Sequence, residues 1–149
     1  MATNWIPKGF HSVTPYLAVH DAARVIEFVK QGFGAQEIMR MPDPDGKVMH
    51  AEVKIGDSIV MIGEARGPRP AMPTSLYVYV EDVDATYKQA LQAGGASTAE
   101  PADQFYGDRT GNVKDPAGNQ WTVATHKEDV SAEELRKRAE TAMRQRKAA

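Results

Sequence analysis

The chain contains no cysteine, so disulfide bonds, thiolate metal sites and cysteine nucleophiles are all excluded. Long apolar runs are also missing, because a run such as Ile59–Ile62 is far shorter than the roughly 20 residues that span a bilayer. Residues 1–8 show no basic stretch followed by an apolar one. We therefore expect no membrane segment, no export signal and a cytoplasmic location for a chain of single-domain size, 149 residues.

The sequence also lacks an excess of positive charge, since its net charge is -2. That charge is unevenly distributed: residues 131–149 carry six basic and three acidic side chains, which leaves the body at -5 and the tail at +3. A negative body repels polyanions, so we expect no nucleic-acid partner. The tail itself predicts one charged helix, which Ser131 begins as an N-cap and which carries only a weak apolar stripe.

An internal repeat organises the body. Residues 14–21 (TPYLAVHD) return as residues 75–82 (SLYVYVED), an offset of 61, and the same offset carries Gly34 onto Gly95 and Gly46 onto Gly107. The two copies predict the same order of elements, with Asp21 and Asp82 as candidate helix caps. The expected strands are 13–19, 35–41, 48–55 and 58–63 in the first copy and 75–80, 97–100, 110–114 and 120–125 in the second, with helices at 22–31 and 83–93.

The second copy also carries the most specific string of the chain, which runs from Tyr106 to Trp121 (YGDRTGNVKDPAGNQW) and continues in residues 124–130 (ATHKEDV). This string and the duplicated βαβββ plan resemble the vicinal oxygen chelate superfamily, which includes glyoxalase I, bleomycin-resistance proteins and extradiol dioxygenases, and in particular its PhnB-like branch. The resemblance implies an α+β fold in which tandem βαβββ units form curled mixed half-sheets around a concave pocket, with helices outside. It also implies a homodimer.

The expected domain covers residues 1–130, with unit one at about 9–64, a linker at 65–73 and unit two at about 74–126, followed by the C-terminal helix 131–149. Alternation along the strands separates an aliphatic face from a polar and aromatic one. The second face is the expected ligand-binding surface, and an ordinary solvent-exposed face is the alternative. Its candidate residues are Thr14, Tyr16, His50, Glu52, Ser75, Tyr77, Tyr79, Gln120 and Thr122.

In metal-dependent members of the superfamily, each unit supplies ligands from its first and last strands. The matching positions here are Thr14, Val60, Ser75 and Thr122, and none of them is a competent ligand for a divalent cation. The resemblance therefore implies a protein without a metal cofactor. One divalent metal held by other residues, with His50 and Glu52 among them, is the alternative.

His50 and Glu52 lie two apart on one strand and are the candidate acid–base pair. The alternative is that His50 merely hydrogen-bonds a neighbouring Glu or Tyr. Arg109 is a candidate clamp for a ligand carboxylate, or else a partner of Asp108 or Asp103.

The irregular segment 101–109 predicts an aromatic lid that contains Tyr106. Trp121 is expected in the core or in an interface, because it has the parity of the buried strand face. His126 is expected at the surface.

These observations favour a metal-free protein that binds a flat or amphipathic small molecule in a tyrosine-lined cavity. The first alternative is a glyoxalase-like lyase or isomerase, or a dioxygenase-like enzyme, that uses non-standard metal ligands or His50 and Glu52. The second is a dimeric structural module without a cavity.

Overall fold

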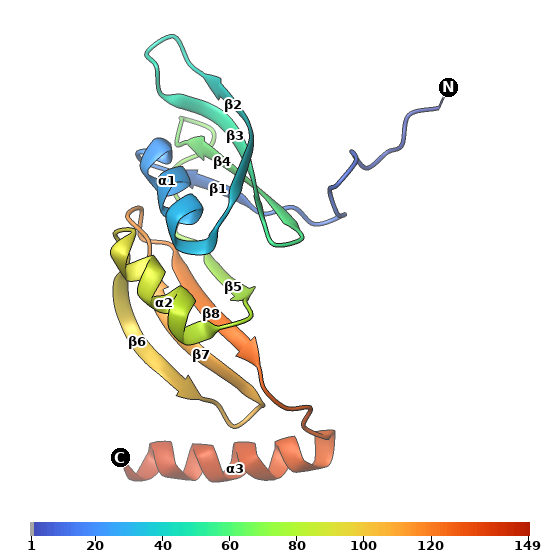
Figure 1. Ribbon diagram of the computed structural model, residues 1–149, viewed down its shortest axis with the longest axis vertical. Helices are drawn as coiled ribbons and strands as arrows, with labels where there is room; N and C mark the ends of the chain where they lie inside the picture. The colour runs from blue at the N-terminus through green and yellow to red at the C-terminus, as the bar shows by residue number, and fades with distance from the viewer. Residues whose placement is uncertain (1) are drawn as a thin grey trace.

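The computed structural model describes residues 2–149 and consists of two four-stranded sheets, one from each repeat (Figure 1). Met1, the first residue of the expected domain 1–130, lies outside the described residues. The first repeat forms β1 (Tyr16–Val19), α1 (Ala22–Phe33), β2 (Gln36–Pro42), β3 (Val48–Ile55) and β4 (Ser58–Glu64). The second forms β5 (Ser75–Tyr79), α2 (Val83–Gln92), β6 (Ala96–Asp103), β7 (Asp108–Lys114) and β8 (Gln120–His126), and α3 (Ala132–Ala148) follows.

The two sheets have the same topology, with strand orders β1-β4-β3-β2 and β5-β8-β7-β6. In each sheet the first strand pairs in parallel with the last, and the other neighbours are antiparallel. Both sheets are open. This confirms the α+β fold of two mixed half-sheets with a C-terminal helix.

The first strand is shorter than expected, because it begins at Tyr16 rather than at residue 13. Pro15 has no N–H to donate to a sheet ladder, so it stands just before the strand and only its carbonyl oxygen joins β4, through Met61 N at 2.9 Å. Thr14 therefore lies outside β1, where its hydroxyl donates to the His11 carbonyl oxygen at 3.2 Å.

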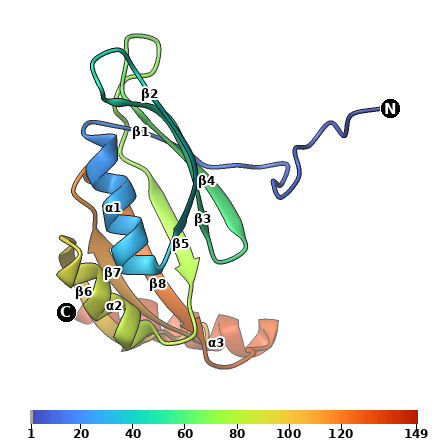
Figure 2. The same cartoon turned by 45° about the horizontal axis from the view of Figure 1, so that its top comes forward.

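The aliphatic faces pack under the helices as the alternation predicts. Leu17 and Val53 from the first sheet and Val113 and Val123 from the second have no exposed surface. Helices α1 and α2 lie side by side on the same side of the two sheets (Figure 2). Gly32 allows this approach, since a Cβ there would come within 3.3 Å of the Ala90 Cα atom.

Aromatic side chains close the junction between the repeats. The Phe33 ring lies 4.9 Å from the Trp121 ring and 5.4 Å from the Phe28 ring, measured between centroids. Trp121 is 2% exposed, which confirms its expected place in the core.

The string around Trp121 folds into a hydrogen-bonded turn centred on Asp115, which is 4% exposed. One carboxylate oxygen accepts from the Ala117 and Asn119 amides at 2.9 and 3.0 Å. The other accepts from Asn119 Nδ2 and from Trp121 Nε1, both at 2.9 Å. The Asn119 side-chain oxygen then accepts from the Thr74 amide at 2.9 Å, so the turn also fixes the start of β5. The part of this segment from Asp115 to Trp121 therefore has a structural role.

The helix caps differ between the repeats. Asp82 caps α2 as expected, because its side chain accepts from the Ala85 amide at 3.1 Å. The expected cap by the Asp21 side chain is wrong: Asp21 adopts a φ of 57° and makes no side-chain cap bond. Instead Glu64, at the end of β4, accepts from the Asp21 and Ala22 amides at 2.9 and 3.0 Å. A carboxylate at this position also complements the positive end of the helix dipole.

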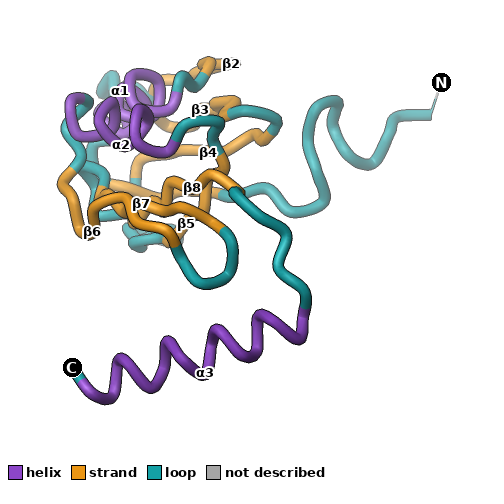
Figure 3. Tube along the Cα trace, turned by 60° about the horizontal axis from the view of Figure 1, so that its bottom comes forward, coloured by secondary structure: helices purple, strands orange, loops and turns teal. Residues whose placement is uncertain are grey.

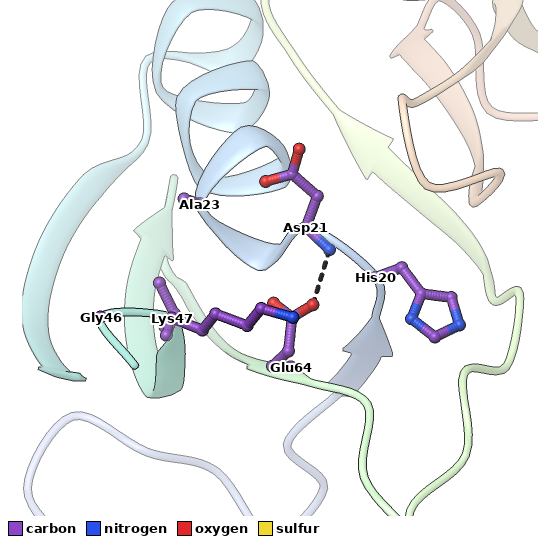
Figure 4. A pocket seen from close by; sticks show the side chains of 7 residues that line it. His20, Asp21, Ala23, Gly46, Lys47 and Glu64 are labelled. Atoms are coloured by element: carbon purple, nitrogen blue, oxygen red, sulfur yellow. Dashed lines mark hydrogen bonds between the residues drawn. The ribbon is translucent and has the colours of Figure 1, made fainter. Parts of the chain in front are cut away.

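A hollow of about 430 Å³ surrounds this cap, with His20 and Lys47 on its walls (Figure 4). Because Glu64 already occupies the first amides of α1, the hollow is not a ready anion site.

Helix α3 stands apart on the side of the sheets away from α1 and α2 (Figure 3). Ser131 caps it by accepting from the Glu134 amide at 3.2 Å, and every residue of α3 keeps some exposed surface. Arg138 ties the helix to the body, since its guanidinium donates to the Phe105 carbonyl oxygen at 3.3 Å and to the Glu128 carboxylate. No helix within residues 2–149 has the length and apolar character needed to cross a membrane.

Candidate ligand-binding face

Two tyrosines of β5 share one buried carboxylate on the face of the second sheet that is turned away from α2. Tyr77 and Tyr79 donate their hydroxyl protons to the same oxygen of Asp108, Oδ2, at 2.6 and 3.0 Å. Asp108 is 4% exposed, whereas the tyrosines are 44% and 62% exposed. Their ring centroids lie 5.2 Å apart. The rings are therefore held in place while their faces stay accessible.

The strand register explains this arrangement. Tyr77 and Tyr79 lie beside Thr122 and Ala124 of β8, and Asp108 of β7 lies beside His126 of β8. All six residues have the parity that points away from the helices. Each tyrosine leans along the sheet to reach Asp108.

His126 binds the other side of the same carboxylate. Its Nδ1 lies 2.7 Å from Asp108 Oδ1, and its Nε2 lies 2.8 Å from Asp129 Oδ1. These hydrogen bonds raise the pKa of His126 above its ordinary value. Burial alone would raise the pKa of Asp108, but the hydrogen bonds from Tyr77, His126 and Tyr79 outweigh it and hold that pKa below its usual range. Burial and the bond to Asp108 raise the pKa of Tyr77 far above its ordinary value.

The stability that His126 contributes is expected to depend on pH. Only the imidazolium can donate from both nitrogens at once, to Asp108 and to Asp129. Because the folded-state pKa is raised above 6.5, this contribution is full below about pH 6.5 and is lost as pH rises through the folded pKa. We expect the difference in unfolding free energy between the parent and His126→Gln to shrink from pH 5.5 to pH 8.5 in urea titrations. A difference that is constant over this range would show that His126 does not hydrogen-bond both aspartates as an imidazolium. Asp129→Asn removes one of the two acceptors and should flatten the pH dependence.

The loop between β6 and β7 places a third tyrosine beside the pair. Tyr106 is 37% exposed, its ring meets that of Phe105 edge-on at 5.3 Å, and its proximity contributes to the raised pKa of Tyr77. The carbonyl oxygen of Gly107 accepts from the Lys127 and Glu128 amides at 2.8 and 3.2 Å, which fixes the loop against the chain that leads to α3.

A groove of about 660 Å³ runs between β5 and the turn that joins β3 to β4. Tyr77 and Tyr79 line it, and its remaining walls are mostly apolar: Pro15, Phe33, Ile55, Val60, Leu76, Val78 and Trp121. This volume and this mixture of apolar area with a few polar atoms are typical of small-molecule sites.

The predicted acid–base pair lies in the other sheet. His50 Nε2 is 3.4 Å from Glu52 Oε1, and the His50 ring stacks on Tyr16 with centroids 5.8 Å apart. This is the structural role considered as the alternative for His50. The Arg69 guanidinium covers the outer face of Tyr16 at 4.3 Å from the ring centroid.

A hollow of about 330 Å³ beside Tyr16 and His50 is lined by the first repeat and the linker. Tyr16 and His50 therefore share no described hollow with Tyr77 and Tyr79.

Arg109 pairs with carboxylates on the other face of the sheet. It has the parity of the helix-covered face, where its Nε and Nη2 atoms donate to the two carboxylate oxygens of Asp84 at 2.9 and 3.0 Å. Nη1 donates to Asp103 at 3.3 Å, one of the two partners considered, whereas Asp108 is not a partner. Since β7 directs Asp108 and Arg109 to opposite faces, Arg109 does not join the tyrosine cluster.

The remaining predicted residues lie on edge strand β5 and on inner strand β8. Ser75 is exposed at the start of β5, and Thr122 is half-buried between Tyr77 and Asn112 in the register. The sequence reasoning missed Asp108 and treated His126 only as a surface residue. The alternation along 108–112 and 120–126 could have indicated these two residues, because His126 lies on the same strand face as Thr122.

Comparison with known proteins adds the family. The model of the Glyoxalase/Bleomycin resistance protein/Dioxygenase superfamily matches residues 9–123. The chain belongs to this superfamily. An uncharacterized protein of Mycobacterium bovis is 36% identical, with 83% of this chain and 89% of the relative covered. An uncharacterized protein of Mycobacterium tuberculosis H37Rv is also 36% identical, with 83% and 79% covered.

Solved structures of the superfamily fold are similar over most of the chain. TioX from Micromonospora sp. ML1 superposes with a TM-score of 0.68 at 25% identity, covering 78% of this chain and 98% of TioX. A glyoxalase-related enzyme from Fulvimarina pelagi superposes with a TM-score of 0.64 at 17% identity, covering 77% and 87%.

The residues at the metal-ligand positions of the superfamily are not suitable ligands for a divalent cation in this chain. Val60 offers no donor atom and is 4% exposed, and the Thr14 hydroxyl donates to a backbone carbonyl. Ser75 and Thr122 supply only neutral hydroxyls, which are poor ligands for a divalent ion. Within residues 2–149, no three His, Asp or Glu side chains gather in a way that could hold a metal ion.

Proposed function

We propose that this chain is a metal-free small-molecule binding protein of the glyoxalase/bleomycin resistance type, which sequesters a flat or amphipathic ligand. The exposed pair Tyr77 and Tyr79, fixed by buried Asp108 at the rim of an apolar groove, is the observation that carries the proposal. Two oriented aromatic rings offer large contact area, and hydrogen bonding to Asp108 limits the rotamer freedom that binding would otherwise cost.

Within the superfamily we place the chain in the PhnB-like branch, on the string from Tyr106 to Trp121, and in the cytoplasm. We also propose a homodimer. Support comes from large apolar side chains that are exposed in one chain, among them Val13 at 85% and Met72 at 64%. A second copy packed against the open sheets would cover such side chains.

Tryptophan fluorescence tests the binding proposal, because Trp121 lines the groove and Trp5 is 86% exposed. In Trp5→Phe, Trp121 is the single reporter. We expect saturable quenching by 2-naphthol, and Tyr77→Ala or Tyr79→Ala should weaken affinity about tenfold through lost aromatic contact. Tyr16→Ala, in the other sheet, is the matched control with unchanged affinity. Equal losses in all three variants, or no quenching, would overturn the proposal.

Elemental analysis of protein purified without a histidine tag separates this proposal from its enzymatic rival. We expect no stoichiometric divalent metal. One tightly held Zn, Ni, Mn or Fe per chain would overturn the metal-free proposal and favour a metalloenzyme with unconventional ligands.

A further inference from the structure

The hydrogen-bond directions in the tyrosine cluster define what its surface offers to a ligand. Tyr77 and Tyr79 each have one hydroxyl proton, and both protons are directed to Asp108 Oδ2. Each phenol oxygen therefore presents only acceptor lone pairs to a ligand. Donation to a carboxylate also makes the aromatic rings more electron-rich, and their faces already carry the negative end of the ring quadrupole.

The net charge around the cluster is negative. Asp108 lies at the hydroxyl ends of the two rings, and His126 bridges it to Asp129. Even with His126 as the imidazolium, these three residues sum to -1. The nearby Arg138 is paired with Glu128 and Glu134, and Arg109 faces the helices, paired with Asp84 and Asp103.

We infer that the groove is selective for an organic cation, an ammonium or onium group on an apolar or aromatic body. The cationic group would lie against the faces of Tyr77 and Tyr79, whose hydroxyls are bound to Asp108, while its body fills the apolar groove towards Trp121. This inference rests on the proposed binding function and narrows it to one class of ligand. An anionic ligand would meet acceptor oxygens and a buried negative charge, which oppose it.

A pair of probes that differ only in charge tests the inference: benzyltrimethylammonium and its neutral carbon isostere, neopentylbenzene. Their binding is followed by NMR shifts of the tyrosine rings in the full chain. Because attraction between a cation and aromatic faces is strengthened by the carboxylate, we expect the cation to bind about tenfold more tightly than the isostere. An isostere that binds as tightly as the cation, or more tightly, overturns the inference.

Variants locate the source of the preference. Asp108→Asn removes the negative charge and leaves only the aromatic contact. The cation should then bind at most about twofold more tightly than the isostere. Tyr77→Phe with Tyr79→Phe keeps both rings but frees Asp108 of its two donors, and it should retain part of the preference. Asp45→Asn is the control, because it removes one charge at an exposed residue in the β2–β3 turn of the other sheet and should leave the preference intact. If circular dichroism shows that Asp108→Asn is unfolded, the inference is tested by the ratio of the two probe affinities in the parent chain and in the double tyrosine variant.

The two proposals fail differently. If 2-naphthol binds in the groove and the cation shows no advantage over its isostere, the cation inference falls and the binding function stands. If no probe perturbs Trp121 or the tyrosines, both fall.

Discussion

Replacing Asp115 with alanine is expected to lower the free energy of unfolding by about 4 kcal/mol, because four N–H donors lose a charged, buried acceptor. The Trp121 indole and the Asn119 amide are themselves buried, so water cannot readily replace the carboxylate. Denaturant unfolding followed by circular dichroism measures this loss.

The first repeat offers a matched control at the corresponding turn. Asp57 there is exposed and accepts only from the Ser58 hydroxyl at 2.9 Å. Asp57→Ala should therefore cost less than about 0.5 kcal/mol, as surface substitutions do. Similar losses for the two variants would show that the Asp115 hydrogen bonds contribute little to stability.

Replacing Gly107 with alanine is expected to cost about 3 kcal/mol and to displace the loop that carries Tyr106. Gly107 has a φ of 103°, which disfavours an L side chain by about 1–2 kcal/mol. An added Cβ would also collide with the carbonyl oxygen of Glu128, a backbone atom that cannot rotate away. The measurements are the unfolding free energy and the NMR shifts of the Tyr106 ring.

Gly94 separates the two causes. Its φ of 107° is nearly the same, but a Cβ there would meet no atom within 4 Å. Gly94→Ala should therefore show only the conformational cost, and Tyr106 should keep its shifts. If the two glycine variants lose the same stability, the collision with Glu128 is not a significant constraint.

The fold could be predicted largely because it is repeated. Alternation in 14–21 and 75–82 located the parallel first strands, and the aliphatic parity of Leu17 and Val123 identified the buried faces. Caps were less predictable. Asp21 and Asp82 occupy the same place in the repeat, yet only Asp82 caps its helix, because Glu64 reaches the amides at the start of α1 from a strand 43 residues away. Sequence proximity carries no information about such a contact.

The candidate site was predictable in part. Parity placed Tyr77 and Tyr79 on the accessible face, but it did not indicate that Asp108 is the carboxylate that holds them. Asp108 precedes the expected strand 110–114 and follows a glycine turn, where an aspartate is ordinarily a turn residue. Its role arises because β7 begins two residues earlier than expected and pairs Asp108 with His126.

The position of Asp108 has a practical consequence for any experiment that tethers the protein. The carboxylate holds the tyrosines through Oδ2 and His126 through Oδ1, and three residues beyond His126 the chain reaches Asp129 and enters α3. A fusion or surface linkage after Ala149 would therefore pull on a helix that follows Asp129, which His126 connects to the carboxylate that holds Tyr77 and Tyr79. The opposite end of the chain extends away from both sheets (Figure 1). Immobilisation through the N-terminus places no load on the chain between His126 and α3.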